Sequence, residues 1–182
     1  MNCNPTNLPR QPLPFIGRKR EIKKIIGTLK SPDCRLFTLV GPGGIGKTRL
    51  AIKIGEELLG EYKDGVYFVP LAHIELVTPQ SLVFQIADSI NFKFYGGQPP
   101  EAQLIKFLDK KTLILIIDNF EHGLDSVTSH FSRREIETFP DVIEVSGRPS
   151  NTPGNSSMKP RRKPLLDSLS LKADLPWRRQ ER

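Results

Sequence analysis

Apolar residues along the chain recur at two different spacings, which predicts a fold of alternating helices and strands. The stretch 15–30 places apolar residues three or four positions apart, which gives a helix one apolar face, at Ile22, Ile25, Ile26 and Leu29. The proline within Ser31–Asp33 ends that helix. By the same criteria we predict strands at 35–40, 65–72 and 112–118, and helices at 48–60, 78–90 and 100–111.

The strand predicted at Thr112–Asp118 has a continuous apolar run rather than an alternating one. Residues Leu113–Ile117 are all apolar, so we expect this strand to be covered on both faces, as happens within a parallel sheet. Strands that alternate with helices indicate a doubly wound α/β fold with a mostly parallel sheet, in which about four strands can be recognised.

Net charge is unevenly distributed along the sequence. The 182 residues carry a formal charge of +7, and residues 151–182 contribute +5 of it, from eight lysines and arginines against three acidic residues. The segment 149–182 is also rich in proline and serine, so we predict a basic tail that is either disordered or forms one weak helix near Leu165–Ala173. This tail suggests nucleic-acid binding only weakly. The proline-rich segment 1–14 is predicted to be a flexible leader on the surface.

The sequence gives no sign of export or membrane insertion. It lacks the roughly 18 consecutive apolar residues that a membrane helix needs, and its N-terminus has no signal-peptide pattern. Two cysteines, Cys3 and Cys34, provide neither a disulfide framework nor a set of metal ligands. These features predict a cytoplasmic protein without a membrane partner.

The segment Gly41–Thr48, with the sequence GPGGIGKT, follows a predicted strand and opens a predicted helix. It has the G-x4-G-K-T spacing of a phosphate-binding loop. Glycines allow backbone N–H groups to converge on phosphate oxygens at the positive end of the following helix. Lys47 would then reach the β- and γ-phosphates, and the Thr48 hydroxyl would bind Mg²⁺. The predicted nucleotide contacts from this segment are Gly41, Gly43, Gly44, Ile45, Gly46, Lys47, Thr48 and Arg49.

Asp118 ends the apolar strand, at the edge where a parallel sheet places its ligand-binding groups. We predict this carboxylate as the second Mg²⁺ contact, made directly or through water. The next residue, Asn119, stands where efficient ATPases often have a glutamate that activates water. Glu121 lies two residues further on and is a candidate for that role, with a plain surface role as the alternative.

Four blocks of sequence, in order, resemble the nucleotide-binding domain of the STAND class of P-loop ATPases. The blocks are PFIGRKREI, LFTLVGPGGIGKTRLA, DGVYFVPLA and LILIIDNFEH, and they extend from about Leu13 to His122. The most similar branch is that of bacterial signalling and transcriptional regulators, which is related to the NB-ARC domains. The resemblance implies a three-layer P-loop core, with adenine contacts from Ile16, Gly17 and Arg18.

The same resemblance implies a further strand that ends in an arginine sensing the γ-phosphate, about thirty residues after the metal aspartate. Asp141–Val145 has a short alternating pattern and Arg148 lies 30 positions after Asp118, so we predict them as sensor strand and sensor. The alternative is Arg133, as a displaced remnant of that motif. In P-loop proteins of this type the sensor strand lies between the phosphate-loop strand and the Asp118 strand.

Such domains place a fifth strand, a helical lid and a Gly-x-Pro sensor further downstream, and the sequence offers no match for them after Ser150. We therefore predict a nucleotide-binding domain at 15–148 that lacks the usual C-terminal lid. The tail at 149–182 would follow it, as in a truncated or frameshifted gene product.

Together these features predict an ATP- or ADP-binding domain with Mg²⁺ that acts as a nucleotide-dependent switch. Slow hydrolysis would involve Lys47, Asp118, Glu121 and Arg148. The alternatives are an ADP-binding module that does not hydrolyse, a fragment of an AAA+-type DNA-associated ATPase, and an inert fragment. The expected partners are the nucleotide and, beyond it, further copies of the chain or effector domains of a longer parent protein.

Overall fold

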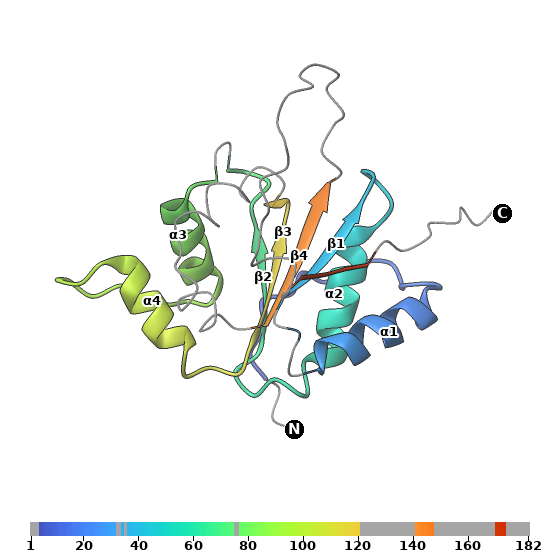
Figure 1. The fold of residues 1–182 in the computed structure, drawn as a ribbon, viewed down its shortest axis with the longest axis horizontal. Helices are drawn as coiled ribbons and strands as arrows, with labels where there is room; N and C mark the ends of the chain where they lie inside the picture. Colours follow the sequence, from blue (N-terminus) through green and yellow to red (C-terminus); the bar gives the residue numbers. More distant parts are fainter. Residues whose placement is uncertain are drawn as a thin grey trace, which may run out of the picture.

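The computed structural model of the chain describes residues 4–31, 34, 36–74, 77–120, 141–147 and 170–173. Its strands form one parallel sheet in the spatial order β2-β3-β4-β1-β5 (Figure 1). The strands are β1 (Leu36–Gly41), β2 (Val66–Pro70), β3 (Ile114–Asp118), β4 (Asp141–Gly147) and β5 (Ser170–Ala173). The helices are α1 (Lys19–Leu29), α2 (Lys47–Leu58), α3 (Pro79–Ser89) and α4 (Pro100–Leu108). The predicted α/β fold with a mostly parallel sheet is confirmed.

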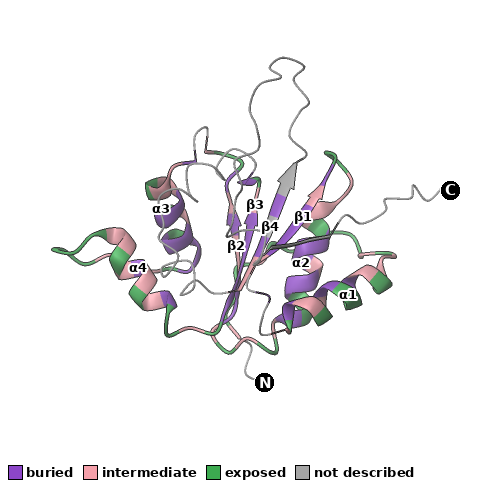
Figure 2. Ribbon diagram, in the orientation of Figure 1, coloured by how far each residue is buried: buried purple, intermediate pink, exposed green. Residues whose placement is uncertain are grey.

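Two apolar clusters, one on each face of the sheet, give the molecule three layers. Helices α1 and α2 cover one face, and α3 and α4 cover the other (Figures 1 and 2). Strand β3 has a continuous apolar run because it supplies both clusters. Ile114 and Ile116 belong to the α1–α2 cluster, while Leu115 and Ile117 belong to the α3–α4 cluster. All four side chains are buried, as the sequence predicts for a central strand.

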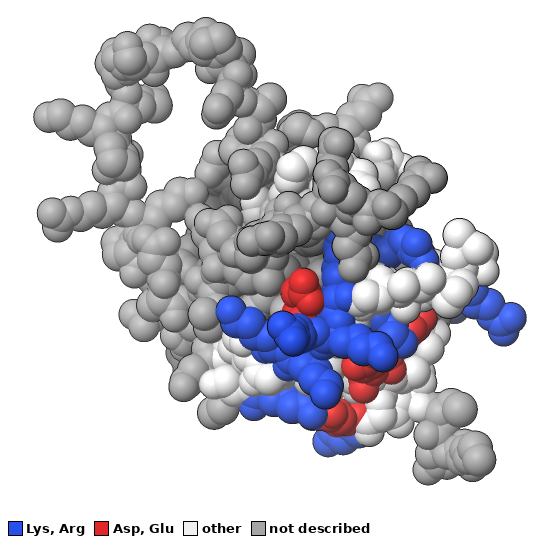
Figure 3. Space-filling model, turned by 90° about the vertical axis from the view of Figure 1, so that its right-hand side faces the viewer, with Lys and Arg blue, Asp and Glu red and all other residues white. Residues whose placement is uncertain are grey.

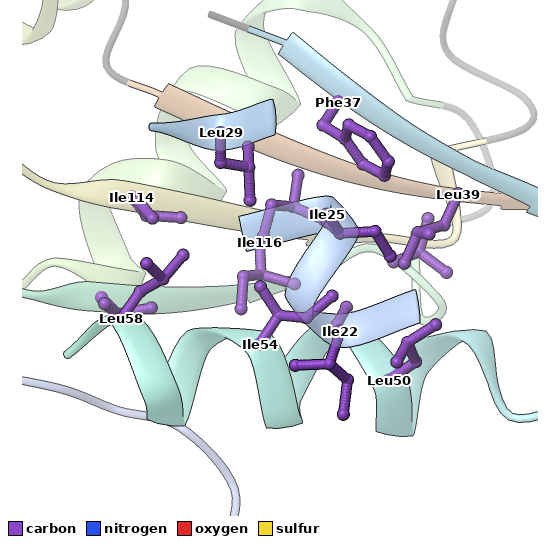
Figure 4. Packing of buried hydrophobic residues seen from close by; sticks show 14 of the residues in the cluster. Ile22, Ile25, Leu29, Phe37, Leu39, Leu50, Ile54, Leu58, Ile114 and Ile116 are labelled. Atoms are coloured by element: carbon purple, nitrogen blue, oxygen red, sulfur yellow. The ribbon is translucent and has the colours of Figure 1, made fainter. Parts of the chain in front are cut away.

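The α1–α2 cluster holds the helix that follows the glycine-rich loop directly against the sheet. In Figure 4, Ile25 of α1 and Ile54 of α2 point toward Ile116 of β3. Each of these side chains is fully buried, which stabilises the fold by roughly 1.5–3 kcal/mol per side chain. Gly55 of α2 lies so close to the sheet that an added Cβ would be 2.7 Å from Ile116 Cδ1. This packing fixes the first turn of α2, where the loop ends.

Strand β4 lies between β1 and β3 and hydrogen-bonds to both. Leu36 of β1 pairs with Val142, and Ile114 of β3 pairs with Asp141. The predicted position of the strand at Asp141–Val145 is therefore confirmed, and the strand continues to Gly147. Because β4 joins them, the carboxyl ends of β1 and β3 meet at one edge of the sheet.

Strand β5 contradicts two predictions for the segment after Ser150. It pairs with β1 in parallel, from Ser170 opposite Leu36 to Ala173 opposite Leu39, so a fifth strand is present after all. The same four residues form a strand where the sequence predicted part of a weak helix. The sequence signal was weak because the strand is short and lies at the edge of the sheet, where only one side needs a partner.

Residues Asn4–Leu8, here called the N-terminal strap, run along the free edge of β2. Thr6 pairs with Val66 in a parallel bridge. The Asn7 side chain donates from Nδ2 to the Phe68 carbonyl at 2.9 Å and accepts from the Phe68 N–H at 2.6 Å. The sequence did not predict these contacts, and the flexibility of the leader at 1–14 stays a prediction. Side-chain hydrogen bonds from asparagine and threonine hold the segment to the sheet, although prolines withhold N–H donors from it.

Candidate nucleotide site

The predicted phosphate-binding loop connects the end of β1 to the start of α2. Gly44 and Gly46 have φ values of 75° and 83°, in the left-handed region that residues with a Cβ seldom adopt. Apart from the chain neighbours, no atom of the described residues lies within 4 Å of the position that a Cβ would take on Gly43 or Gly44, so open space lies beside both glycines. Helix α2 begins at Lys47 without a side-chain cap or an acidic residue in its first turn. Its first N–H groups are therefore available as donors to an anion.

Lys47 lies across the loop that precedes it. Its Nζ donates to the carbonyl oxygens of Gly41 at 2.9 Å and Pro42 at 3.0 Å. An ammonium group has three N–H donors, and the third has no partner among the described residues. A phosphate at the loop would therefore meet a cation that already lies beside the glycine backbone.

Thr48 and Asp118 meet at the site although 70 positions separate them in the sequence. Thr48 Oγ1 donates to Asp118 Oδ1 at 2.9 Å, and both side chains are half-buried. The Asp118 carbonyl accepts from the Leu71 N–H at 3.0 Å, which fixes the backbone that carries the carboxylate. Mg²⁺ prefers oxygen ligands and is commonly held by one or two carboxylates together with substrate phosphates, so this pair fits Mg²⁺ beside a phosphate loop. The structure brings the two predicted metal ligands together, and the metal contact itself stays a prediction.

The segment predicted to contact adenine lies against the loop. Gly17 and Arg18 both have left-handed backbone conformations, with φ of 82° and 53°, and Ile16 is 84% exposed. Arg18 donates from Nη2 to the Ile45 carbonyl at 2.8 Å, which ties the segment to the loop. The exposed Ile16 side chain lies two residues before this anchor, and a contact with adenine stays a prediction.

Arg49 has a contact that the sequence did not predict. Its Nη2 donates to the carbonyl oxygens of Leu13 at 3.0 Å and Pro14 at 3.4 Å. The guanidinium therefore anchors the chain that leads into the adenine segment to the first turn of α2. No sequence signal could have identified Leu13 and Pro14 here, because their acceptors are backbone carbonyls. A direct nucleotide contact from Arg49 stays a prediction.

Asn119 has a conformational role in addition to its place after Asp118. Its φ is 67°, in the left-handed region, and its N–H donates to the Val145 carbonyl of β4 at 3.0 Å. Asparagine tolerates this conformation better than most residues with a Cβ. The sequence alone showed only that a glutamate is missing at this position. In the structure, the left-handed backbone conformation accounts for an asparagine there.

Three predicted site residues lie outside the described residues: Glu121, Arg148 and the alternative sensor Arg133. For Arg148 the neighbouring backbone is informative. Gly147, the residue before it, ends β4 and pairs with Gly41, the first glycine of the loop. The sensor roles and the role of Glu121 stay predictions.

The described residues offer neither a separate metal site nor a membrane-spanning helix. No group of three or more histidine, cysteine, aspartate or glutamate side chains could hold a metal ion in that part of the chain. A Mg²⁺ site that shares its ligands with a nucleotide would not require such a group. None of the helices in that same part is long and apolar enough to cross a membrane.

Two mycobacterial proteins resemble parts of this sequence, while no protein-family model matches it. An uncharacterised protein of Mycobacterium tuberculosis is 32% identical over 113 residues, which are 62% of this chain and 28% of that protein. Another protein of this organism, described as a candidate HTH-type transcriptional regulator, is 38% identical over 93 residues, which are 50% of this chain and 10% of that protein. The matched region thus spans less than a third of either relative's length.

A solved structure resembles the fold over a larger part of the chain. The crystal structure of Cdc6p from Pyrobaculum aerophilum matches with a TM-score of 0.53 and 20% sequence identity, over 77% of this chain and 40% of that chain. At this identity the similarity is one of fold. The chain therefore shares an α/β fold with that structure, and its glycine-rich loop lies between β1 and α2.

Proposed function

We propose that the chain binds ATP or ADP together with Mg²⁺ and is the nucleotide-binding domain of a STAND-type regulatory ATPase. The observation that carries the proposal is the 2.9 Å contact between Thr48 and Asp118 beside a glycine-rich loop that already holds Lys47. A hydroxyl at the start of α2 and a carboxylate at the end of β3 are the kinds of oxygen group that bind Mg²⁺ beside a phosphate. Their meeting depends on β4, which joins β1 to β3.

Each part of the site has a separate task in this proposal. The N–H groups of the loop and of the first turn of α2 bind the phosphates, and Lys47 adds a positive charge beside them. Thr48 and Asp118 hold Mg²⁺, which when bound neutralises phosphate charge and orients the terminal phosphate. The exposed Ile16 side chain and the backbone of Gly17 contact the adenine.

The regulatory part of the proposal depends on the edge of the sheet where β4 ends. Arg148 follows Gly147, which pairs with Gly41 of the loop, so a change at the terminal phosphate could be transmitted through this residue. A switch of this kind requires two states that interact differently with the terminal phosphate. The similarity to a candidate HTH-type transcriptional regulator supports a regulatory class, and we place such a protein in the cytoplasm, with hydrolysis as a slow resetting step.

A second candidate is a module that binds ADP without hydrolysing ATP. Asn119 supports it, because an amide in the position after Asp118 cannot accept a proton from an attacking water as a carboxylate can. The two candidates share the same binding site and differ only in turnover. An AAA+-type DNA-associated ATPase is a third candidate, supported only by the fold.

Thermal unfolding with and without nucleotide tests the binding proposal. Mg-ADP or Mg-ATP at a hundredfold excess over Kd should stabilise the native chain by about 2.7 kcal/mol, and Lys47→Ala should abolish the shift. Lys53→Ala is the matched control, because Lys53 lies on the same helix but pairs with Glu56 at 3.3 Å. The absence of a shift for the wild-type chain at millimolar nucleotide would contradict the proposal. Phosphate release that depends on Lys47 would then separate the switch from the ADP module.

A further inference from the structure

Helix α1 has an exposed basic surface that the nucleotide site does not use. Its four basic residues are exposed, and among the described residues no ion pair or hydrogen bond engages their side chains: Lys19, Arg20, Lys23 and Lys24. Two other lysines on this side of the molecule are paired. Lys30 lies 2.8 Å from Glu61, and Lys53 lies 3.3 Å from Glu56. The four residues, here called the basic face of α1, are therefore distinct in lacking partners.

The basic face is directed away from the core. At about 100° per residue, positions 19, 20, 23 and 24 fall within an arc of roughly 140° around the helix. The buried residues Ile22, Ile25 and Leu29 occupy the opposite side and pack into the α1–α2 cluster. Figure 3 shows lysine and arginine side chains gathered on the α1–α2 side of the molecule, with acidic side chains at separate places among them.

This arrangement of charges opposes the stability of the helix. Lys19 with Lys23 and Arg20 with Lys24 are like-charged pairs at i,i+4, which destabilise a helix. Two cations also lie in the first turn, at the positive end of the helix dipole, and the last turn contains none. Glu21 is the one acidic residue in α1; it lies in the first turn, where it favours the helix, and has no ion pair with any residue that the structure describes. A helix selected only for stability would place its cations in the last turn, so this placement suggests a ligand that offsets the repulsion.

We propose that the basic face of α1 binds the phosphate backbone of a nucleic acid. Four cations lie within roughly 7.5 Å of helix length, a local density of positive charge that suits the closely spaced phosphates of a nucleic-acid backbone. Backbone phosphates would relieve both like-charged pairs and would also interact favourably with the positive end of the helix dipole. Binding at this surface would be independent of nucleotide binding, because none of the four residues belongs to the phosphate-binding loop or to the adenine segment.

The described structure favours a nucleic acid over a membrane surface. A helix that binds a membrane interface inserts an apolar face into the lipid. The apolar face of α1 is instead buried against α2 and the sheet, with Ile25 only 1% exposed. Contacts with backbone phosphates need only the charged face, and α1 presents that face on a rigid element of the fold.

Binding of a fluorescein-labelled duplex DNA of arbitrary sequence, measured by anisotropy without nucleotide at several salt concentrations, tests the proposal. The variant replaces Lys19, Arg20, Lys23 and Lys24 by glutamine in the full chain. Glutamine is a good helix former, so the fold should be kept. We expect the affinity to fall at least tenfold at about 50 mM salt, and the slope of log K against log salt to decrease in magnitude by about 3. The same variant should unfold at a temperature roughly 2–5 °C higher in low salt, because the repulsion is removed.

Two control variants test whether the location of the charge matters. The first removes four exposed lysines elsewhere in the fold by Lys63→Gln, Lys93→Gln, Lys106→Gln and Lys110→Gln, and should bind within about threefold of wild type, since the phosphate contacts are kept. The second neutralises Arg161, Arg162 and Lys163 in the basic segment near the C-terminus, and should also bind.

Three results would overturn the proposal: wild-type affinity in the α1 variant, loss of binding in either control variant, or binding to vesicles of phosphatidylserine and phosphatidylcholine without binding to DNA. The thermal shift by nucleotide, measured on the same α1 variant, should remain. A failure of the nucleotide proposal is therefore distinguishable from a failure of this one.

Discussion

At the carboxyl end of the sheet, polar side chains lie half-buried beside an open glycine loop. At the amino end of the sheet, polar side chains form hydrogen bonds with one another or with the backbone of residues far away in the sequence. Tyr62 donates from its hydroxyl to Asp141 Oδ2 at 2.8 Å, which joins the region before β2 to the first residue of β4. Asp64 accepts from Lys111 Nζ at 2.9 Å and from the Thr112 N–H at 2.8 Å, which joins the same region to β3.

The fold shifts the pKa values of Asp64 and Tyr62. Hydrogen bonds from the Thr112 N–H and then from Lys111 lower the pKa of Asp64. Burial first, and then the hydrogen bond to Asp141, raise the pKa of Tyr62. Both groups are held in one protonation state by partners that belong to the fold. The difference between the two ends suggests a division of tasks, in which the amino end stabilises the sheet and the carboxyl end keeps its donors and oxygens for ligands. Each variant below should affect one end and spare the other.

Gly65→Ala should cause the largest loss of stability. Gly65 has a φ of 103°, and an added Cβ would be 2.0 Å from the Pro5 carbonyl oxygen, so the N-terminal strap would have to leave the edge of β2. We expect a loss of roughly 2–4 kcal/mol in the free energy of unfolding measured with urea, because strain and lost hydrogen bonds add together.

Gly60→Ala is the control for the Gly65 variant, because nothing lies within 4 Å of its Cβ position and its φ is not in the left-handed region. It should change the free energy of unfolding by less than about 0.5 kcal/mol. Equal losses in the two variants would show that the strap contributes nothing.

Asp118→Asn, at the carboxyl end of the sheet, should weaken nucleotide binding and leave the stability of the fold nearly unchanged. Asparagine keeps an oxygen that can accept from Thr48, so the unfolding temperature without ligand should stay within about 2 °C of wild type. The affinity for Mg-ADP should fall by about tenfold, or roughly 1.4 kcal/mol, because a carboxylate ligand is lost. With EDTA in place of Mg²⁺ the variant and wild type should bind ADP equally. A Mg²⁺-independent loss would mean that Asp118 acts on the fold and not on the metal.

The sequence predicted most of the fold because its apolar patterns are local and strong. The continuous run in β3 and the helical spacing in α1 each identify an element without any tertiary information. The position of β4 also followed, because the phosphate-loop strand and the Asp118 strand need a common neighbour. The sequence did not predict strand β5 or the contacts of the N-terminal strap. Both lie at edges of the sheet and are held by partners distant in sequence, so their own residues carry little signal.

For the candidate site, the sequence predicted which residues meet but not how the backbone supports them. Thr48 and Asp118 were matched by motif and by strand position, and the structure brings them together. The anchoring of Leu13 by Arg49 and the left-handed backbone of Asn119 had no comparable signal. Such contacts depend on the approach of backbone atoms in the folded chain, which side-chain identity does not encode.

The ion pair of Asp64 should make the stability of the amino end depend on pH. Because the folded pKa of Asp64 is lowered, its charge stabilises the fold above the unfolded value of about 3.9, and this contribution is lost as the pH falls through the folded pKa. Asp64→Asn should therefore cost about 1 kcal/mol at pH 7 and progressively less below about pH 4. Urea unfolding of both proteins at several pH values measures this. A difference that stays constant down to pH 3 would exclude Asp64 as the titrating group.

The smallest predicted effect compares two tyrosines that differ mainly in their surroundings. Tyr62→Phe removes the hydrogen bond to Asp141 and should cost roughly 0.5–1 kcal/mol. Tyr95 is 73% exposed, and its hydrogen bonds to Gln103 are made by its backbone, whereas its hydroxyl has no partner among the described residues. Tyr95→Phe should therefore cost almost nothing. Urea unfolding gives both values.

The nucleotide-induced thermal shift should be unchanged in both tyrosine variants, because Tyr62 and Asp141 lie at the end of the sheet opposite the loop. If Tyr62→Phe weakened nucleotide binding without a loss of stability, β4 would have to transmit changes from its first residue to its last. The two ends of the sheet would then be parts of one mechanism and not separate regions with separate tasks.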